Sequence, residues 1–338
     1  MKFHRRRVEL LRYSIGAGIV GAGLLALRYA LRPATKTPLP DTISPAIFAT
    51  RVFPTSQGQV VYHESGSGDP LLFIHGISLG ASSYLWSKIY PRFAATHHVF
   101  APDLVGFGES ERPDRALSAA DHVRSLAEFI RGVCGGRLPI LIGSDLGAGF
   151  CALLATQHPD LVSRLLLLMP TGLREFGHDR LPPGIAFASR LPGLNGFLYR
   201  NYLARRTSVR GWLENHGFAD PARLTEEMVD VYTTCAQQAG ADHAILHFLS
   251  GSYHFDLEAR LPLIPHPTTL LWAAQAAYPP VDWAARFQAL IPHCRLRILE
   301  AAGLLAPLEQ PDALTALITD ELDGGLRIVE AFPSESPA

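Results

Sequence analysis

The sequence has almost no excess of charge of either sign. Its 338 residues include 30 Lys and Arg against 31 Asp and Glu, which gives a formal net charge of -1. A nearly neutral chain has no overall field that would draw it onto the phosphates of nucleic acid. We therefore expect no nucleic-acid partner, and any other partner must be recognised by a local site.

Motifs for metals and nucleotides are also missing from the sequence. The four cysteines are far apart and form none of the Cys-x-x-Cys or Cys/His spacings of structural metal sites. The glycine-rich stretch 143–149 has neither the dinucleotide fingerprint nor the P-loop spacing. We expect no cofactor and no metal site, and we interpret each thiol as a buried structural residue. The cysteines are Cys134, Cys151, Cys235 and Cys294.

The N-terminus differs in kind from the rest of the chain. Five Lys and Arg precede an apolar run at residues 13–27, and this order is typical of a membrane signal. A spanning helix needs about 20 residues, and the run reaches that length if Arg28 and Arg32 snorkel. No convincing small-x-small cleavage site precedes Arg28, which favours an uncleaved single-pass anchor at residues 1–32 over a cleaved signal peptide. The side of the membrane stays open.

A proline-rich linker follows at residues 33–46. Its four prolines disfavour a helix, and its polar composition disfavours a core segment, so we interpret it as a tether. Residues 47–330 then form one folded unit, and residues 331–338 form a short tail.

The folded unit alternates short apolar strands with amphipathic helices. This alternation predicts an α/β architecture, in which helices cover both faces of a mostly parallel sheet. From 171–260 the alternation stops and helical stretches replace it, which indicates a helical cap between core segments 47–170 and 261–330. The expected strands are 59–64, 71–74, 99–101, 139–142, 165–169, 268–272 and 296–299, and the expected core helices lie near 123–133, 147–155, 283–290 and 311–322.

Four motifs lie at the ends of these expected strands, in a fixed order. Together they resemble the α/β-hydrolase superfamily, in the capped branch that includes haloalkane dehalogenases, epoxide hydrolases and many esterases. The resemblance spans nearly the whole folded unit, and it implies an α/β-hydrolase fold with the cap inserted after the sixth strand. The motifs are His75-Gly76, Asp103 to Ser110, Gly143-Ser144-Asp145-Leu146-Gly147, and the 303–311 stretch that ends in Glu309-Gln310-Pro311.

The third motif is a nucleophile elbow that carries Asp145 where such elbows usually carry serine. A tight turn from strand to helix needs small residues on both sides, so that the central side chain projects into the cleft. The amide of Leu146 and the amide of Ile77 can form an oxyanion hole there, and we expect His75-Gly76 to shape that loop. An alternative interpretation is that Asp145 only caps the following helix.

The resemblance also implies a mechanism and its partners. In dehalogenase-like and epoxide-hydrolase-like members, an aspartate at this place attacks carbon, and histidine-activated water hydrolyses the resulting ester. The histidine would follow the last strand, where this chain has Leu304. The supporting acid would follow the strand ending at Trp272, where the chain has Ala276 or a neighbour. Because Ile77 and Leu146 occupy the places of the halide-binding pair, dehalogenation is disfavoured.

Another residue could replace the missing base. Glu175 is the one carboxylate in the alternative acid position, within residues 170–175. The cap contains several histidines, and His254, where the cap returns to the sheet, is the strongest candidate to partner Asp145. Each of them is more simply interpreted as an exposed or backbone-bonded side chain. The cap histidines are His178, His216, His243, His247 and His254.

Three interpretations of function stay open at this point. The protein hydrolyses a small apolar ester- or epoxide-type substrate at a nonstandard site centred on Asp145. Alternatively, it is inactive, and its cap and apolar cleft bind a hydrophobic ligand or a protein partner. In the third interpretation it is a cofactor-free lyase or proton-transfer enzyme. Asp145 would then act as acid or base in a cleft lined by Leu304 and Ala276, where loss of water raises its pKa. The sequence fixes neither the substrate nor the oligomeric state.

Overall fold

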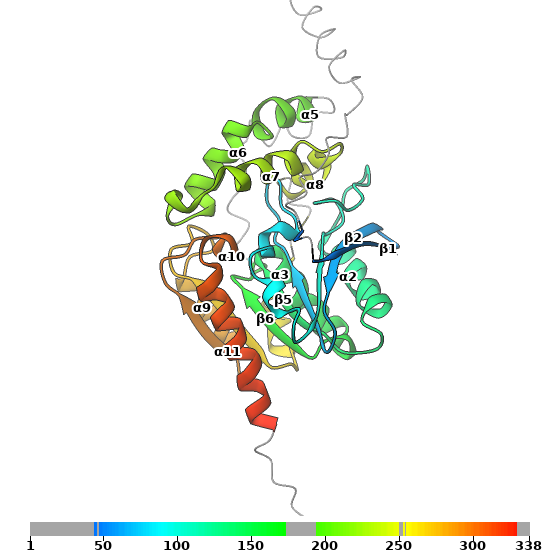
Figure 1. The fold of residues 1–338 in the computed structure, drawn as a ribbon, viewed down its shortest axis with the longest axis vertical. Helices are drawn as coiled ribbons and strands as arrows, with labels where there is room; N and C mark the ends of the chain where they lie inside the picture. Colours follow the sequence, from blue (N-terminus) through cyan, green and yellow to red (C-terminus); the bar gives the residue numbers. More distant parts are fainter. Residues whose placement is uncertain (1–43, 46, 174–193, 250–252, 254, 330–338) are drawn as a thin grey trace, which may run out of the picture.

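The computed structural model describes residues 44–45, 47–173, 194–249, 253 and 255–329 (Figure 1). The expected anchor at residues 1–32 and the expected tail lie outside the described residues. Within the described part of the chain, no helix combines the length and the apolar character needed to cross a membrane.

A single eight-stranded sheet forms the centre of the molecule, in the order β1-β2-β4-β3-β5-β6-β7-β8. β1 and β2 form an antiparallel pair, β2 runs antiparallel to β4, and all other neighbours are parallel. The prediction of a mostly parallel α/β sheet is therefore confirmed. The strands are β1 (Ala49–Thr55), β2 (Gly58–Ser65), β3 (Pro70–Ile74), β4 (His98–Pro102), β5 (Ile140–Ser144), β6 (Arg164–Leu168), β7 (Thr268–Ala273) and β8 (Arg295–Leu299).

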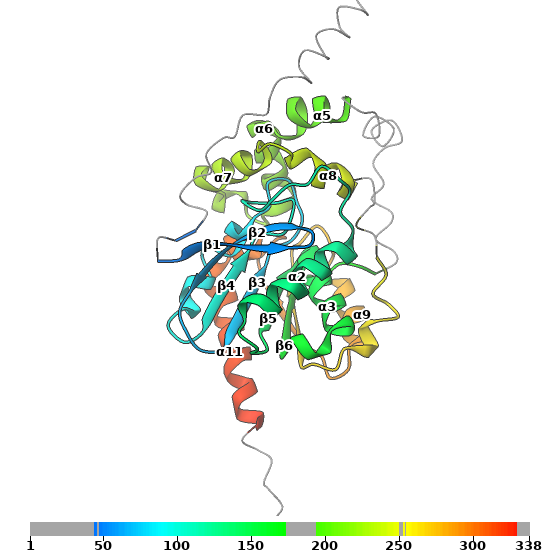
Figure 2. The same ribbon diagram turned by 90° about the vertical axis from the view of Figure 1, so that its right-hand side faces the viewer.

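Helices cover both faces of this sheet, which explains why its central strands are almost entirely apolar. α2 (Ala119–Val133) and α3 (Asp145–Gln157) contact each other in front of the sheet in Figure 2, and α11 (Pro311–Val329) lies behind it. α2 begins with a capping box, in which Ser118 and Asp121 each accept a hydrogen bond from the other's backbone amide.

The cap consists of helices between β6 and β7, and it lies above the sheet in Figure 1. Its helices are α5 (Leu194–Leu198), α6 (Arg206–Trp212), α7 (Glu226–Ala236) and α8 (Ala241–Leu249), with π-helical turns at Tyr199–Leu203 and Leu213–Gly217. The other helical segments are Ser83–Trp86, Tyr90–Phe93, Pro159–Leu161, Pro221–Arg223, Leu261–Leu263, α9 (Asp282–Leu290) and α10 (Ala306–Glu309).

Glu309 fastens the cap to the core. Its buried carboxylate accepts hydrogen bonds from the amides of Asp220 at 2.7 Å and Ala219 at 3.1 Å in the cap, and from Gly303 at 2.7 Å in the loop after β8. Hydrogen bonds to a charged acceptor are stronger than neutral ones. The loop that carries Leu304 is therefore held against the cap.

Three features differ from the sequence-based expectations. β1 was not predicted, because its residues are mostly exposed and Pro54 interrupts its pattern. α3 begins at Asp145, two residues before Gly147. Cys294 is partly exposed, whereas the other three cysteines are buried as expected.

Candidate active site

Asp145 lies at the sharp turn between β5 and α3. Its φ of +52° is unusual for a residue with a side chain, and such strain clusters at functional sites. The flanking glycines are required by close contacts, because a Cβ on Gly143 would lie 2.7 Å from the Cα of Ala148. A Cβ on Gly147 would lie 2.2 Å from the carbonyl oxygen of His75. The backbone therefore holds the Asp145 side chain in one direction.

The Asp145 carboxyl is bound by the loop after β3. The Ile77 amide donates a hydrogen bond to Oδ2 at 3.3 Å. Burial raises the pKa of Asp145 to about 6, although the amides of Leu146 and Ile77 favour the ionised form. Thr171 acts in the same direction as the amides, but its hydroxyl makes no hydrogen bond of normal geometry with any described residue. The N-cap position of α3 is occupied by Ser144, so Asp145 is the first residue of the helix and not its N-cap.

A small apolar pocket of about 20 Å³ opens at this carboxyl. It lies between the elbow, the loop after β3, helix α7 of the cap and the loop after β8. The structure thus brings together Asp145, the His75-Gly76-Ile77 loop and Leu304, whereas Leu146 and Ala276 do not line this pocket. The lining residues are His75, Gly76, Ile77, Ser78, Ala81, Leu85, Ser144, Asp145, Tyr232, Leu304 and Leu305.

His75 has both ring nitrogens engaged by the backbone. Nε2 accepts a hydrogen bond from the Leu104 amide at 2.9 Å, so Nδ1 carries the proton that it donates to the Gly76 carbonyl at 2.7 Å. Burial also lowers the pKa of His75, which keeps the ring neutral. No lone pair remains to take a proton from water, and the ring instead fixes the loop that carries Ile77.

The positions expected for the histidine and the acid hold apolar side chains. Leu304 lines the pocket beside Asp145. Ala276 is buried in the loop after β7, and this loop is joined to the loop after β8 by a hydrogen bond from the Gln275 amide to the Ala302 carbonyl at 3.0 Å. Among the described residues, His75 is the only histidine that lines the pocket.

The cap histidines give no base within the described part of the chain. His216 is exposed, and His243 lies 3.6 Å from the Asp114 carboxylate. None of His216, His243 and His247 lines the pocket. His254, His178 and Glu175 lie outside the described residues.

Tyr232 of α7 is a pocket residue that was not predicted from the sequence. Its ring packs edge-on against Tyr84 at 6.5 Å, and burial raises its pKa well above the usual value, so its hydroxyl stays protonated. An aromatic residue on the apolar face of a predicted helix is not distinguishable from ordinary core in the sequence.

Comparison with known proteins matches residues 71–317 to the model of the alpha/beta hydrolase family. A 2-hydroxy-6-oxo-6-(2'-aminophenyl)hexa-2,4-dienoic acid hydrolase of Metapseudomonas resinovorans is 26% identical over 74% of this chain and 83% of its own. A haloalkane dehalogenase of Bradyrhizobium diazoefficiens is 36% identical over 38% of this chain and 42% of its own.

Solved structures share the fold. The epoxide hydrolase CorEH superposes with a TM-score of 0.70 at 19% identity, over 82% of this chain and 99% of its own. A membrane phospholipase A, described as a bacterial virulence factor, superposes with a TM-score of 0.67 at 23% identity, over 96% of this chain and 99% of its own.

Proposed function

Because the chain belongs to the α/β-hydrolase family, we propose that it hydrolyses a small apolar substrate of the ester or epoxide class at Asp145. The observation that carries this proposal is the Asp145 carboxyl, which an elbow with φ of +52° presents to an apolar pocket. The apolar lining of the pocket suits an uncharged molecule.

For an epoxide, the Asp145 carboxylate attacks one ring carbon and the ring C–O bond breaks. The new alkoxide takes a proton from the hydroxyl of Tyr232, a residue that lines the same pocket. The product of this step is a hydroxyalkyl ester of Asp145. Water then attacks the ester carbonyl, and the amides of Ile77 and Leu146 stabilise the negative charge that develops on its oxygen. The acyl C–O bond breaks, the leaving oxygen takes one proton of the attacking water to give a diol, and the other proton returns to Tyr232, which restores the Asp145 carboxylate.

Leu304 determines which of the two steps is slow. A leucine has no group that takes a proton from the attacking water, whereas a positioned general base contributes about 10²- to 10⁴-fold to a rate. We therefore propose that formation of the ester is faster than its hydrolysis.

The test is a panel of p-nitrophenyl esters and aryl epoxides with wild type and Asp145→Asn. The exposed Asp160→Asn is the matched control, since it removes a carboxylate outside the pocket. We expect turnover in wild type and Asp160→Asn and its loss in Asp145→Asn. Equal rates in all three proteins would remove Asp145 from the chemistry.

The apolar wall formed by Leu304 and Leu305 favours a second candidate, a protein that binds a hydrophobic small molecule without changing it. The same panel separates the two functions. Ligands that raise the melting temperature of wild type and Asp145→Asn equally, with no product from either, would support binding alone.

We also propose that residues 1–32 attach the protein to a membrane. The basic cluster followed by an apolar run supports this proposal. So does the similarity to the membrane phospholipase A, which extends over 96% of the chain.

A further inference from the structure

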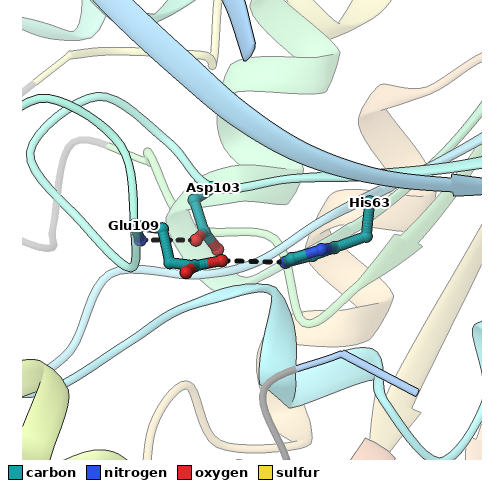
Figure 3. A group of neighbouring side chains, drawn as sticks. All are labelled: His63, Asp103 and Glu109. Carbon is teal, nitrogen blue, oxygen red and sulfur yellow. Dashed lines mark hydrogen bonds and ion pairs between the residues drawn. The ribbon is translucent and has the colours of Figure 1, made fainter. Parts of the chain in front are cut away.

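Three side chains that the hydrolase site does not use converge beside β2 and β4. His63 comes from β2, Asp103 follows β4, and Glu109 belongs to the next loop (Figure 3). One nitrogen or oxygen atom from each lies within 4.8 Å of the others. An imidazole nitrogen and carboxylate oxygens are ligands of divalent metals such as zinc.

His63 has an unsatisfied nitrogen that points into this cluster. Its side chain is 1% exposed, and Nε2 makes no hydrogen bond with any described residue. Nε2 faces the Glu109 carboxylate at 3.5 Å, and Nδ1 lies 3.1 Å from the Thr50 hydroxyl. Metal-binding histidines use their second ring nitrogen in this way: when the Thr50 hydroxyl accepts the Nδ1 proton, Nε2 carries the lone pair that binds an ion.

Asp103 is completely buried and held in place by the backbone. Its Oδ1 accepts the Ser83 amide at 2.6 Å, and its Oδ2 accepts the Glu109 amide at 2.7 Å. A carboxylate has about four acceptor positions. The two amides leave acceptor capacity on both oxygens, and they fix the orientation of the carboxyl group.

The spacing suits a small cation. With bonds of about 2.0–2.2 Å, two ligands of a tetrahedral zinc ion lie roughly 3.4 Å apart, and His63 Nε2 and Glu109 Oε2 are 3.5 Å apart. Asp103 lies within 4.8 Å of both atoms, so it would reach the same ion after a shift of at most about 1.4 Å. The Glu109 side chain is 31% exposed, which gives the ion a route from solvent and leaves a position for water.

We propose that His63, Asp103 and Glu109 bind one divalent cation of the zinc class. The ion would tie β2 to β4 and to the loop between Asp103 and Glu109. The same loop supplies the Leu104 amide to His75, so the ion would steady the wall of the pocket without touching substrate. This proposal is independent of the chemistry of Asp145.

The experiment uses the untagged full chain, freed of metal with a chelator and titrated with Zn²⁺ in a calorimeter. We expect one strong site, and a rise in melting temperature of about 5 °C or more at saturating Zn²⁺. His63→Gln and Glu109→Gln should each weaken binding by about 100-fold or more, beyond what loss of an outer partner causes. Asp145→Asn should bind as wild type does.

His98→Gln is the matched control. His98 belongs to the same sheet and faces Glu64 at 3.7 Å, so the variant removes a similar histidine–carboxylate pair outside the cluster. It should bind zinc as wild type does. Glu109 is partly exposed, so Glu109→Gln should fold even if His63→Gln does not. Absence of a strong site in wild type, or an unchanged affinity in Glu109→Gln, would overturn the proposal.

Discussion

Asp145 combines a strained backbone, an amide hydrogen bond from another loop and a pKa raised to about 6. A carboxylate in water is a weak nucleophile because its charge is solvated, and an apolar pocket removes much of that solvation. Above pH 6 the group is ionised and able to attack. Below pH 6 it is protonated, so the first step should slow as the pH falls through this value.

The raised pKa of Asp145 also predicts a pH-dependent stability. The folded protein keeps this proton up to about pH 6, whereas the unfolded chain releases it near pH 4. The wild type therefore loses stability as the pH rises from 4 to 6. Asp145→Asn does not titrate, so it should gain about 1–2 kcal/mol relative to wild type across this window, after allowance for partial exposure. Urea unfolding at pH 4.5 and pH 8 measures this difference, and a difference that stays constant would contradict it.

Leu304 offers a gain-of-function test. Leu304→His places an imidazole in the pocket beside Asp145 and should speed hydrolysis of the ester by about 10²-fold or more, by activating water. Leu304→Asn is the control, because it adds polarity without a base. Single-turnover kinetics of ester decay measure the effect. Equal decay in wild type and Leu304→His would contradict the role assigned to this position.

The places of some site residues could be predicted from the sequence, and those of others could not. Asp145 and Leu304 could be placed beside each other because strand ends and short turns fix where their side chains go. Ala276 was expected to line the cleft, but it is buried one loop away from the pocket. Tyr232 could not be found, since the packing of a cap helix depends on contacts that are distant in the sequence.

Among the elements, the turn between β5 and α3 has the least freedom to change. A Cβ on Gly147 would lie 2.2 Å from the backbone oxygen of His75, and neither backbone segment can move without disturbing the sheet. Gly147→Ala should therefore destabilise the protein by about 2–4 kcal/mol. Gly211→Ala in α6 is the control, because nothing lies near its added methyl group, and it should stabilise by about 0.5–1 kcal/mol. Thermal unfolding of both variants checks this contrast, and equal effects would refute it.

The elements themselves were largely predictable. Buried strands such as β3, and β5 after its first residue, are short and mostly apolar, and covered parallel sheets require such runs. β1 could not be predicted, because an exposed edge strand has no apolar face that would produce an alternating hydrophobic pattern. The sequence marked the cap as helical, but it could not give the order in which its helices pack over the pocket.

At the scale of the whole molecule, the proposed attachment of residues 1–32 to a membrane gives a testable prediction. Deletion of residues 1–32 removes the basic cluster and the apolar run. We expect the truncated protein to move from the membrane fraction to the soluble fraction. Deletion of residues 331–338 is the control and should leave the distribution unchanged. Membrane retention of the protein that lacks residues 1–32 would place the attachment elsewhere.

The cluster of His63, Asp103 and Glu109 also depends on the fold of the whole molecule. No spacing in the sequence connects these residues, because antiparallel pairing of β2 with β4 brings them together. The sequence therefore predicted no metal site. Sites of this kind become visible only when the strand order is known.

The most direct measurement is the intact mass of the protein after exposure to an aryl epoxide. If Asp145 is the nucleophile and Leu304 slows the second step, wild type should gain the mass of one epoxide, and peptide mapping should place it on Asp145. Asp145→Asn should gain none. A wild type that turns over the epoxide without such a mass, or an equal mass gain in Asp145→Asn, would contradict the assignment of Asp145 as the reacting group.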